Sequence, residues 1–174
     1  SGKYLVLHME PMDSDGGLRG GNIPNTKSYH DDTLKLLDEI LEGYPDLKLV
    51  LAHTAMTNSG NLKYLLDKYP NLISSVKIRG YHPRKGHWNS LEPIYRKNER
   101  LLYKDWAILF ESYSDRFVIE TDFKFLRAQN MSVGDGKRYI KKDIRRIRKI
   151  LGQLSIETAE KIAYKNAQKY FLKY

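Results

Sequence analysis

The chain has 174 residues, a length that suits one domain or part of one. Its apolar share of 41% supports a hydrophobic core and is too high for a disordered chain. Lysine and arginine total 30 against 21 acidic residues, so the net charge is +9, which suits anionic substrates or nucleic acid without requiring either. The absence of cysteine excludes disulfides, zinc fingers and cysteine nucleophiles, and no apolar run approaches the roughly 20 residues of a membrane span. We favour a cytoplasmic protein, with the periplasm as the alternative.

The first predicted strand begins almost at the first residue. Residues 3–10 (KYLVLHME) start an apolar run at once, whereas most domains begin with a looser segment. We therefore favour the C-terminal part of a longer protein over a short complete one.

One pattern then recurs three times. Each copy opens near a tyrosine, continues with a turn-forming pair and ends in an aliphatic run of strand length, in residues 43–53, 68–79 and 112–122. Amphipathic helical spacing precedes each copy, in residues 33–41, 62–66 and 102–110. Because strands that alternate with helices form parallel sheets with right-handed crossovers, the sequence predicts an α/β fold with about four parallel strands.

Two C-terminal helices follow the last predicted strand. The first covers residues 139–151, and its apolar stripe consists of Ile140, Ile144, Ile147 and Leu151. Ser155 has the residue type of an N-cap and predicts a final helix over residues 156–171.

Three long connections each follow a predicted strand, in residues 11–30, 79–100 and 123–136. Long connections in compact domains are usually functional or disordered. These three would lie at the carboxyl edge of the sheet, where α/β folds bind ligands.

His8, His53 and Asp122 each end a predicted strand. His53 and Asp122 both lie nine residues after a tyrosine of the repeat, Tyr44 and Tyr113, so they should sit at the same height on their strands. Imidazole and carboxylate together suit a divalent transition metal such as zinc or manganese. Asp122 is also a candidate general base. The alternative for each is a polar side chain that merely ends a strand.

These segments resemble the amidohydrolase superfamily, in the branch that contains aminocarboxymuconate-semialdehyde decarboxylase and pyrone-dicarboxylate lactonase. Residues 3–8 and 47–53 resemble its fifth and sixth strands, each ending in histidine. Residues 115–122 (DRFVIETD) resemble its eighth strand, which ends in aspartate, and residues 155–167 resemble its terminal helix with an Asn-Ala pair. The resemblance covers nearly the whole chain.

The resemblance implies the C-terminal half of a (β/α)8 TIM barrel, with residues 1–174 as a single partial domain. It implies that His8, His53 and Asp122 bind a metal and that Asp122 binds metal or moves protons. The family's His-x-His pair belongs to its first strand, and no His-x-His occurs in this sequence. The metal site would therefore be incomplete in this chain, and we expect either a homodimer or a separate N-terminal half to pair with it.

Four further residues are candidates for substrate binding. Glu10 should point the same way as His8, because alternate residues of a strand share a face. Arg79 suits bidentate binding of a carboxylate, with a salt bridge at the barrel rim as the alternative. His82 and His87 lie in the long connection after the third strand, where a solvated basic loop is the alternative.

Residues 137–149 form the most basic stretch of the chain and carry an isoleucine stripe at helical spacing. A solvated helix face is the favoured interpretation, and nucleic-acid binding is the less favoured one.

From the strand-end residues and the resemblance, the preferred function is part of a metal-dependent hydrolase or, second, a decarboxylase. It would act on a small carboxylated or cyclic substrate through a metal-activated water. The alternative is a non-catalytic binding or scaffold domain that binds anions or nucleic acid through this helix.

Overall fold

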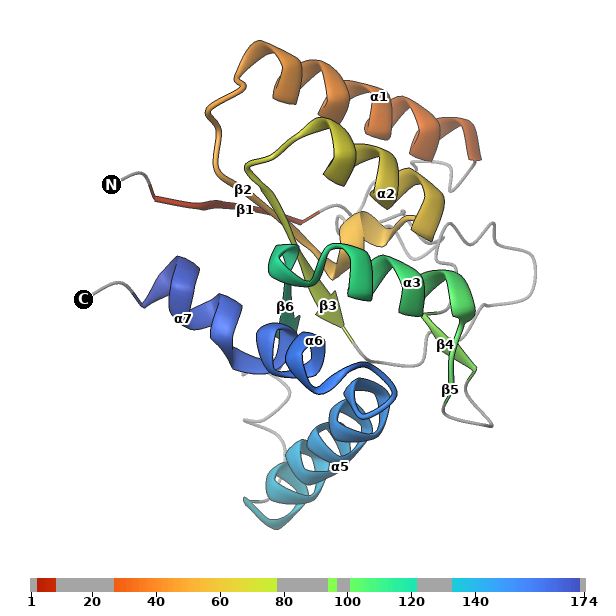
Figure 1. The fold of residues 1–174 in the computed structure, drawn as a ribbon, viewed down its shortest axis with the longest axis vertical. Helices are drawn as coiled ribbons and strands as arrows, with labels where there is room; N and C mark the ends of the chain where they lie inside the picture. Colours follow the sequence, from red (N-terminus) through yellow and green to blue (C-terminus); the bar gives the residue numbers. More distant parts are fainter. Residues whose placement is uncertain (1–2, 9–26, 78–93, 97–100, 122–132, 173–174) are drawn as a thin grey trace. The chain divides into compact units, whose positions relative to one another are not determined.

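The computed structural model describes residues 3–8, 27–77, 94–96, 101–121 and 133–172 (Figure 1). The chain divides into two compact units. The N-terminal unit holds the described residues up to Ser75, and the C-terminal unit holds those from Val76 onward.

The N-terminal unit alternates strands and helices. In chain order its elements are β1 (Leu5–His8), α1 (Lys27–Gly43), β2 (Leu49–Ala52), the 3-10 turn η1 (His53–Met56), α2 (Ser59–Lys68) and β3 (Leu72–Lys77), which extends into the C-terminal unit. β1 pairs in parallel with β2, and β2 pairs in parallel with β3. The strand–helix alternation and parallel pairing predicted for this part of the chain are confirmed.

The sheet has four strands in the order β1-β2-β3-β6, where β6 covers Phe117–Glu120. The predicted α/β class and number of main strands are thus confirmed. The further prediction, that this sheet is half of a closed barrel, stays a prediction.

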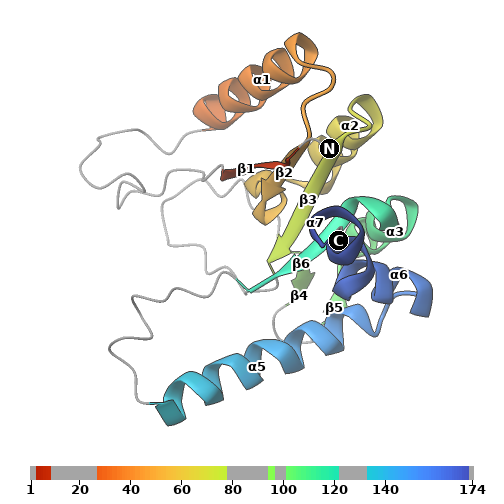
Figure 2. The ribbon, with the colours of Figure 1, turned by 90° about the vertical axis from the view of Figure 1, so that its left-hand side faces the viewer.

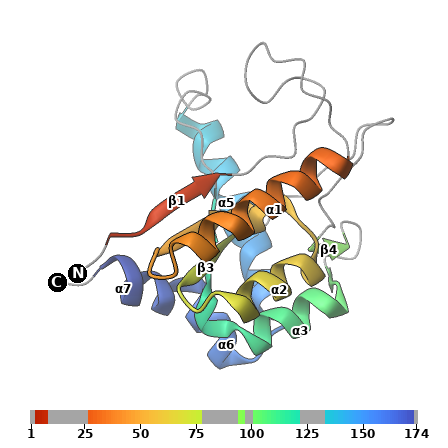
Figure 3. The same cartoon turned by 90° about the horizontal axis from the view of Figure 1, so that it is seen from above.

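Each helix of the N-terminal unit buries leucines on one face. Figure 1 and Figure 3 show α1 and α2 side by side. The buried positions of the two helices are Leu37, Leu41, Leu62, Leu65 and Leu66. Their i, i+3 and i+4 spacing is typical of one apolar helix face.

A network of polar side chains joins α1 to α2. The Lys68 ammonium lies 2.9 Å from the Asp38 carboxylate and 2.5 Å from that of Glu42. The Tyr69 hydroxyl donates to Asp38 Oδ1 at 2.5 Å. Burial by itself raises the pKa of Asp38, but hydrogen bonds from Tyr69, Lys68 and Tyr64 outweigh it and the pKa is lowered. Burial and the bond to Asp38 raise the pKa of Tyr69 to about 12.

The C-terminal unit begins with a short antiparallel ribbon and ends in helices. Its elements are β4 (Tyr95–Arg96), β5 (Leu101–Leu102), α3 (Lys104–Ser112), the 3-10 turn η2 (Ser114–Arg116), β6, α5 (Val133–Leu151), α6 (Ile156–Glu160), the π-helical turn η3 (Lys161–Lys165) and α7 (Asn166–Phe171). Its core contains an aromatic cluster in which Phe110 lies 5.8 Å from Trp106 and 4.9 Å from Phe117, between ring centroids. No helix of the described ranges is long and apolar enough to cross a membrane.

The predicted cap of the final helix is confirmed and is more elaborate than expected. Ser155 accepts from the Thr158 N–H, as an N-cap does. The Glu111 carboxylate of α3 accepts from the Ser155 N–H at 2.6 Å and from the Thr158 hydroxyl at 2.6 Å. Burial by itself raises the pKa of Glu111, but these hydrogen bonds outweigh it and lower the pKa. An acid from another helix thus takes the place that Glu at N3 has in a capping box.

Asn166 joins the C-terminal helices to the turn before β6. Its side-chain amide donates at 2.7 Å to the carbonyls of Ser114 and Phe117, and the residue is buried. Asn166 belongs to the Asn-Ala pair that resembles the superfamily's terminal helix. Here it fixes the turn that leads into β6.

The helix over residues 139–151 begins earlier than predicted and buries a different stripe. α5 starts at Val133, although Gly134 and Gly136 lower helix propensity there. Ile140 and Ile144 are 42% and 41% exposed, whereas Asp143, Ile150 and Leu151 are buried. The apolar stripe predicted from the spacing is therefore covered only toward its C-terminal end, because periodicity identifies an apolar face but not how much of it a neighbour covers.

Candidate metal site

The two strand-end histidines of the N-terminal unit lie together. His8 is the last residue of β1 and pairs in register with Ala52, the last residue of β2, and His53 follows directly. Because the strands are parallel, both imidazoles belong to the carboxyl edge of the sheet. Their ring centroids are 4.6 Å apart and the ring planes are nearly perpendicular, at 88°. The expected position of these two residues is confirmed.

This distance is compatible with two ligands of one ion. With zinc–nitrogen bonds of about 2.1 Å and tetrahedral angles, two imidazoles on one zinc have centroids about 5 Å apart. Two imidazoles alone are fewer than the three protein ligands of a catalytic zinc site. The described residues contain no group of three or more His, Cys, Asp or Glu side chains placed to hold a metal.

The backbone at His53 has an unusual conformation. His53 and Thr54 have φ values of 56° and 57°, in the left-handed region. Thr is β-branched, and such residues rarely adopt this conformation, which costs on the order of 1–3 kcal/mol per residue. Strain of this kind persists only where the surroundings fix it and is concentrated at functional sites.

Two hydroxyl groups hold this backbone. The His53 N–H donates to Ser75 Oγ of β3 at 3.2 Å, and the Thr54 hydroxyl donates to the His53 carbonyl at 2.5 Å. Ser75 and Thr54 are buried, and so is His53 at 7% exposure, whereas His8 is exposed. One imidazole is therefore anchored in the protein interior and its neighbour lies at the surface. A ligand that reaches both would approach from the side of His8.

The remaining predicted site residues lie outside the described residues. These are the catalytic and metal-binding candidate Asp122 and the substrate-binding candidates Glu10, Arg79, His82 and His87. β6 ends at Glu120, two residues before Asp122. The structure therefore brings together His8 and His53 and describes no other member of the predicted set.

Sequence analysis missed the residues that support His53. Ser74 and Ser75 interrupt the aliphatic run of β3, and both are buried. A hydroxyl in a buried strand needs a hydrogen-bond partner. The two serines therefore indicated a hydrogen bond to a neighbouring segment. The left-handed turn gave no signal, because neither histidine nor threonine is a turn-forming residue of the glycine type.

No protein-family model matches the chain, and neither a curated protein nor a solved structure matches it. The resemblance to the amidohydrolase superfamily therefore remains a prediction from the residues quoted above.

Proposed function

We propose that this chain carries part of the active site of a metal-dependent hydrolase. The observation that carries the proposal is the contact between His8 and His53 at the carboxyl ends of neighbouring parallel strands. The strained backbone at His53 supports it, because Ser75 and Thr54 maintain a costly conformation that orients this imidazole.

In this proposal each side chain has a defined role. His8 and His53 bind a divalent ion such as zinc or manganese, which would act as a Lewis acid and lower the pKa of a water molecule. Asp122 binds the same ion or accepts a proton from the attacking water. Glu10, Arg79, His82 and His87 contact a small carboxylated or cyclic substrate, in which Arg79 suits a carboxylate group. Hydrolysis is the preferred reaction and decarboxylation the second.

Because this sequence has no His-x-His pair, we propose that ligands from outside the chain complete the site of His8, His53 and Asp122. A separate N-terminal half or a second copy would supply them. The chain alone should then bind zinc weakly, with a dissociation constant well above the nanomolar values of complete sites.

Calorimetric titration with zinc and with manganese tests the site. His53→Asn is the variant of choice, because asparagine tolerates the left-handed conformation and so preserves the turn while removing the imidazole. If His8 and His53 share one ion, His8→Ala and His53→Asn should each abolish the weak binding. The double variant should then lose no more than either single variant, a non-additivity typical of residues that act together.

Two outcomes would contradict the proposal. Zinc binding that survives in the double variant would show that the histidines are not the ligands. Tight one-to-one binding by this chain, lost in His53→Asn, would show a complete site and refute the partial-site proposal. A chain without affinity for zinc or manganese would favour the alternative, a non-catalytic binding or scaffold domain.

A further inference from the structure

The solvent-facing side of α5 concentrates positive charge. Residues 137–149 contain eight basic residues, and Asp143 is their one acidic residue. At 3.6 residues per turn, all eight basic side chains fall on one half of the helix circumference. Asp143 lies on the opposite half, where it is buried and pairs with Arg146 at 3.3 Å. Within this stretch Asp143 thus pairs with Arg146, one of the eight basic residues.

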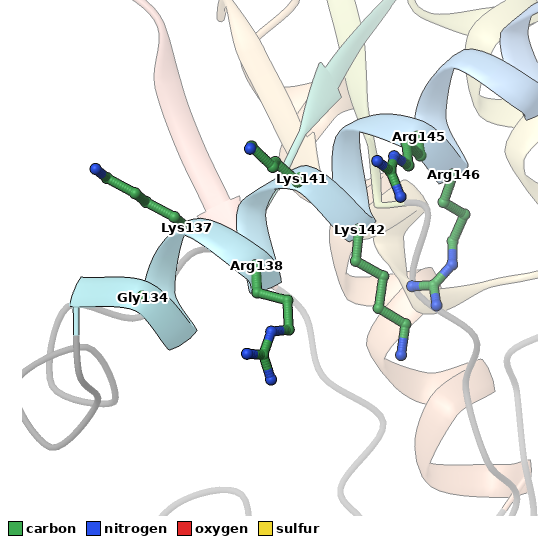
Figure 4. A pocket seen from close by; sticks show the side chains of 7 residues that line it. All are labelled: Gly134, Lys137, Arg138, Lys141, Lys142, Arg145 and Arg146. Atoms are coloured by element: carbon green, nitrogen blue, oxygen red, sulfur yellow. The ribbon is translucent and has the colours of Figure 1, made fainter.

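Six of these cations line an open concavity of about 570 Å3 (Figure 4). The described residues that line it all belong to α5: Gly134, Lys137, Arg138, Lys141, Lys142, Arg145 and Arg146. Figure 4 shows Lys137 and Lys141 projecting to one side of the helix and Arg138 and Lys142 to the other. Figure 2 shows α5 as one long helix, so these residues are distributed along a single rod.

We propose that the basic face of α5 binds the phosphate backbone of duplex DNA. The charge spacing supports this partner. Residues 137–149 rise about 18 Å along the helix axis, which gives one cation per about 2.3 Å. Duplex DNA carries one phosphate per roughly 1.7 Å of its axis.

The shape of the helix also suits duplex DNA. An α-helix with its side chains is about 10–12 Å wide, and the major groove of B-form DNA is about 12 Å wide. Cations on both flanks would meet the phosphates of both strands. The deep, narrow major groove of A-form RNA does not admit a helix in this way.

Burial argues against an anionic membrane surface. A membrane-bound amphipathic helix inserts its apolar side between lipids. In α5 that side is occupied at its C-terminal end, where Ile150 and Leu151 are buried, and of its described apolar side chains only Ile140 and Ile144, at 42% and 41% exposure, are open to lipid. Lys137, Arg138, Lys141, Lys142 and Arg145, by contrast, are all exposed. Residues 137–149 contain eight lysines and arginines, so contacts to phosphates should supply most of the affinity.

The test measures binding of this chain to a fluorescent mixed-sequence DNA duplex by anisotropy, between 50 and 200 mM salt. The variant replaces Lys137, Lys141, Lys142 and Arg145 with glutamine, which is a good helix former. The matched control likewise has glutamine in place of Lys35, Lys63, Lys104 and Lys169. These lysines are exposed on α1, α2, α3 and α7. Both variants have a net charge of +5, since 9 − 4 = 5.

We expect the α5 variant to bind at least roughly tenfold more weakly than the control. If all four cations contact phosphates, the slope of log K against log salt should also become shallower by about 3.6. Circular dichroism establishes that both variants are folded, and the double variant Lys137→Gln/Lys141→Gln serves if the quadruple variant is not. His53→Asn should leave DNA binding unchanged, which separates this surface from the metal site.

Three results would overturn the proposal. The first is no binding to the duplex by the unmodified chain at 50 mM salt. The second is an equal loss in the α5 and control variants, which would reflect net charge alone. The third is tighter, α5-dependent binding to phosphatidylserine vesicles, to duplex RNA or to heparin than to duplex DNA.

Discussion

β1 and β2 have almost the same sequence and opposite environments. Leu5-Val-Leu-His8 pairs residue by residue with Leu49-Val-Leu-Ala52. Leu5 and Val6 are nevertheless 55% and 63% exposed, whereas their partners Leu49 and Val50 are 1% and 3% exposed. β2 has a strand on each side, and β1 lies at the end of the strand order. An aliphatic run therefore specifies a strand, but its neighbours decide how much that strand contributes to stability.

The largest expected effect comes from truncating the paired leucines. Leu49→Ala should lower the free energy of unfolding by about 2–5 kcal/mol, because it removes a buried side chain and leaves a cavity. Leu5→Ala, at the register partner, should cost about 0.5 kcal/mol or less. Urea denaturation of the two variants measures the difference. Equal costs would show that β1 is covered in solution and would break the comparison.

The next largest loss of stability should come from removing the Ser75 hydroxyl, which supports the turn after β2. Ser75→Ala removes the hydroxyl that accepts from the buried His53 N–H and should cost about 1–3 kcal/mol. Ser74→Ala is the matched control on the same strand, because its hydroxyl lies at a long 3.5 Å from the Leu51 carbonyl. Hydrogen exchange should show faster opening of the His53 amide in Ser75→Ala alone. Equal behaviour of the two variants would refute the support assigned to Ser75.

The exposed edge of β1 should promote association. An apolar strand at the end of a sheet invites pairing along its outer edge, and covering one exposed apolar side chain contributes about 1.5–3 kcal/mol. We expect light scattering to give a mass above the 20.4 kDa of one chain at micromolar concentration. Val6→Lys should raise the dissociation constant about tenfold or more, because lysine disfavours edge pairing. A folded monomer under these conditions would contradict the expectation.

The smallest expected effect is the pH dependence of stability that the polar network between α1 and α2 produces. Because the pKa of Asp38 is lowered in the folded chain, its carboxylate stabilises the fold above about pH 4, and this is lost as the pH falls through the folded value. The pair with Lys68 is partly exposed, so the loss should stay below about 1 kcal/mol. Asp38→Asn should flatten the acid limb of stability against pH. If Asp38→Asn leaves the acid limb unchanged, the limb belongs to another carboxyl group.

The same network predicts that stability falls at alkaline pH. The pKa of Tyr69 is raised to about 12, so its protonated form is the stabilised one. The contribution is complete below about pH 10 and is lost as the pH rises toward 12. Tyr69→Phe should remove this limb in a fluorescence titration. An unchanged limb would assign it to another group.

Local patterns predicted the elements, and tertiary contacts decided what could not be predicted. The repeated tyrosine-turn-strand pattern located β2, β3 and β6, and Ser155 marked the start of the last helix, because these signals depend on nearby residues. The rule that parallel strands end at one edge placed His8 beside His53. Three features could not be predicted: the cap from Glu111, the hydrogen bond to Ser75 and the exposure of Ile144. The first two join residues far apart in sequence, and the third depends on how much a neighbouring element covers. Residue spacing contains neither kind of information.

The π-helical turn η3 has a consequence for insertions and deletions. Its wider loop lets the Asn166 N–H bond to the Lys161 carbonyl five residues earlier, so the turn contains one residue more than an α-helix would. Deleting one residue from this turn would restore a regular helix, because a π-turn takes up one extra residue within nearly the same rotation about the axis. Asn166 would then keep nearly the same facing toward the carbonyls of Ser114 and Phe117. Deleting a second residue would rotate every following side chain by about 100° and remove these contacts. The segment therefore tolerates the loss of one residue but not of two.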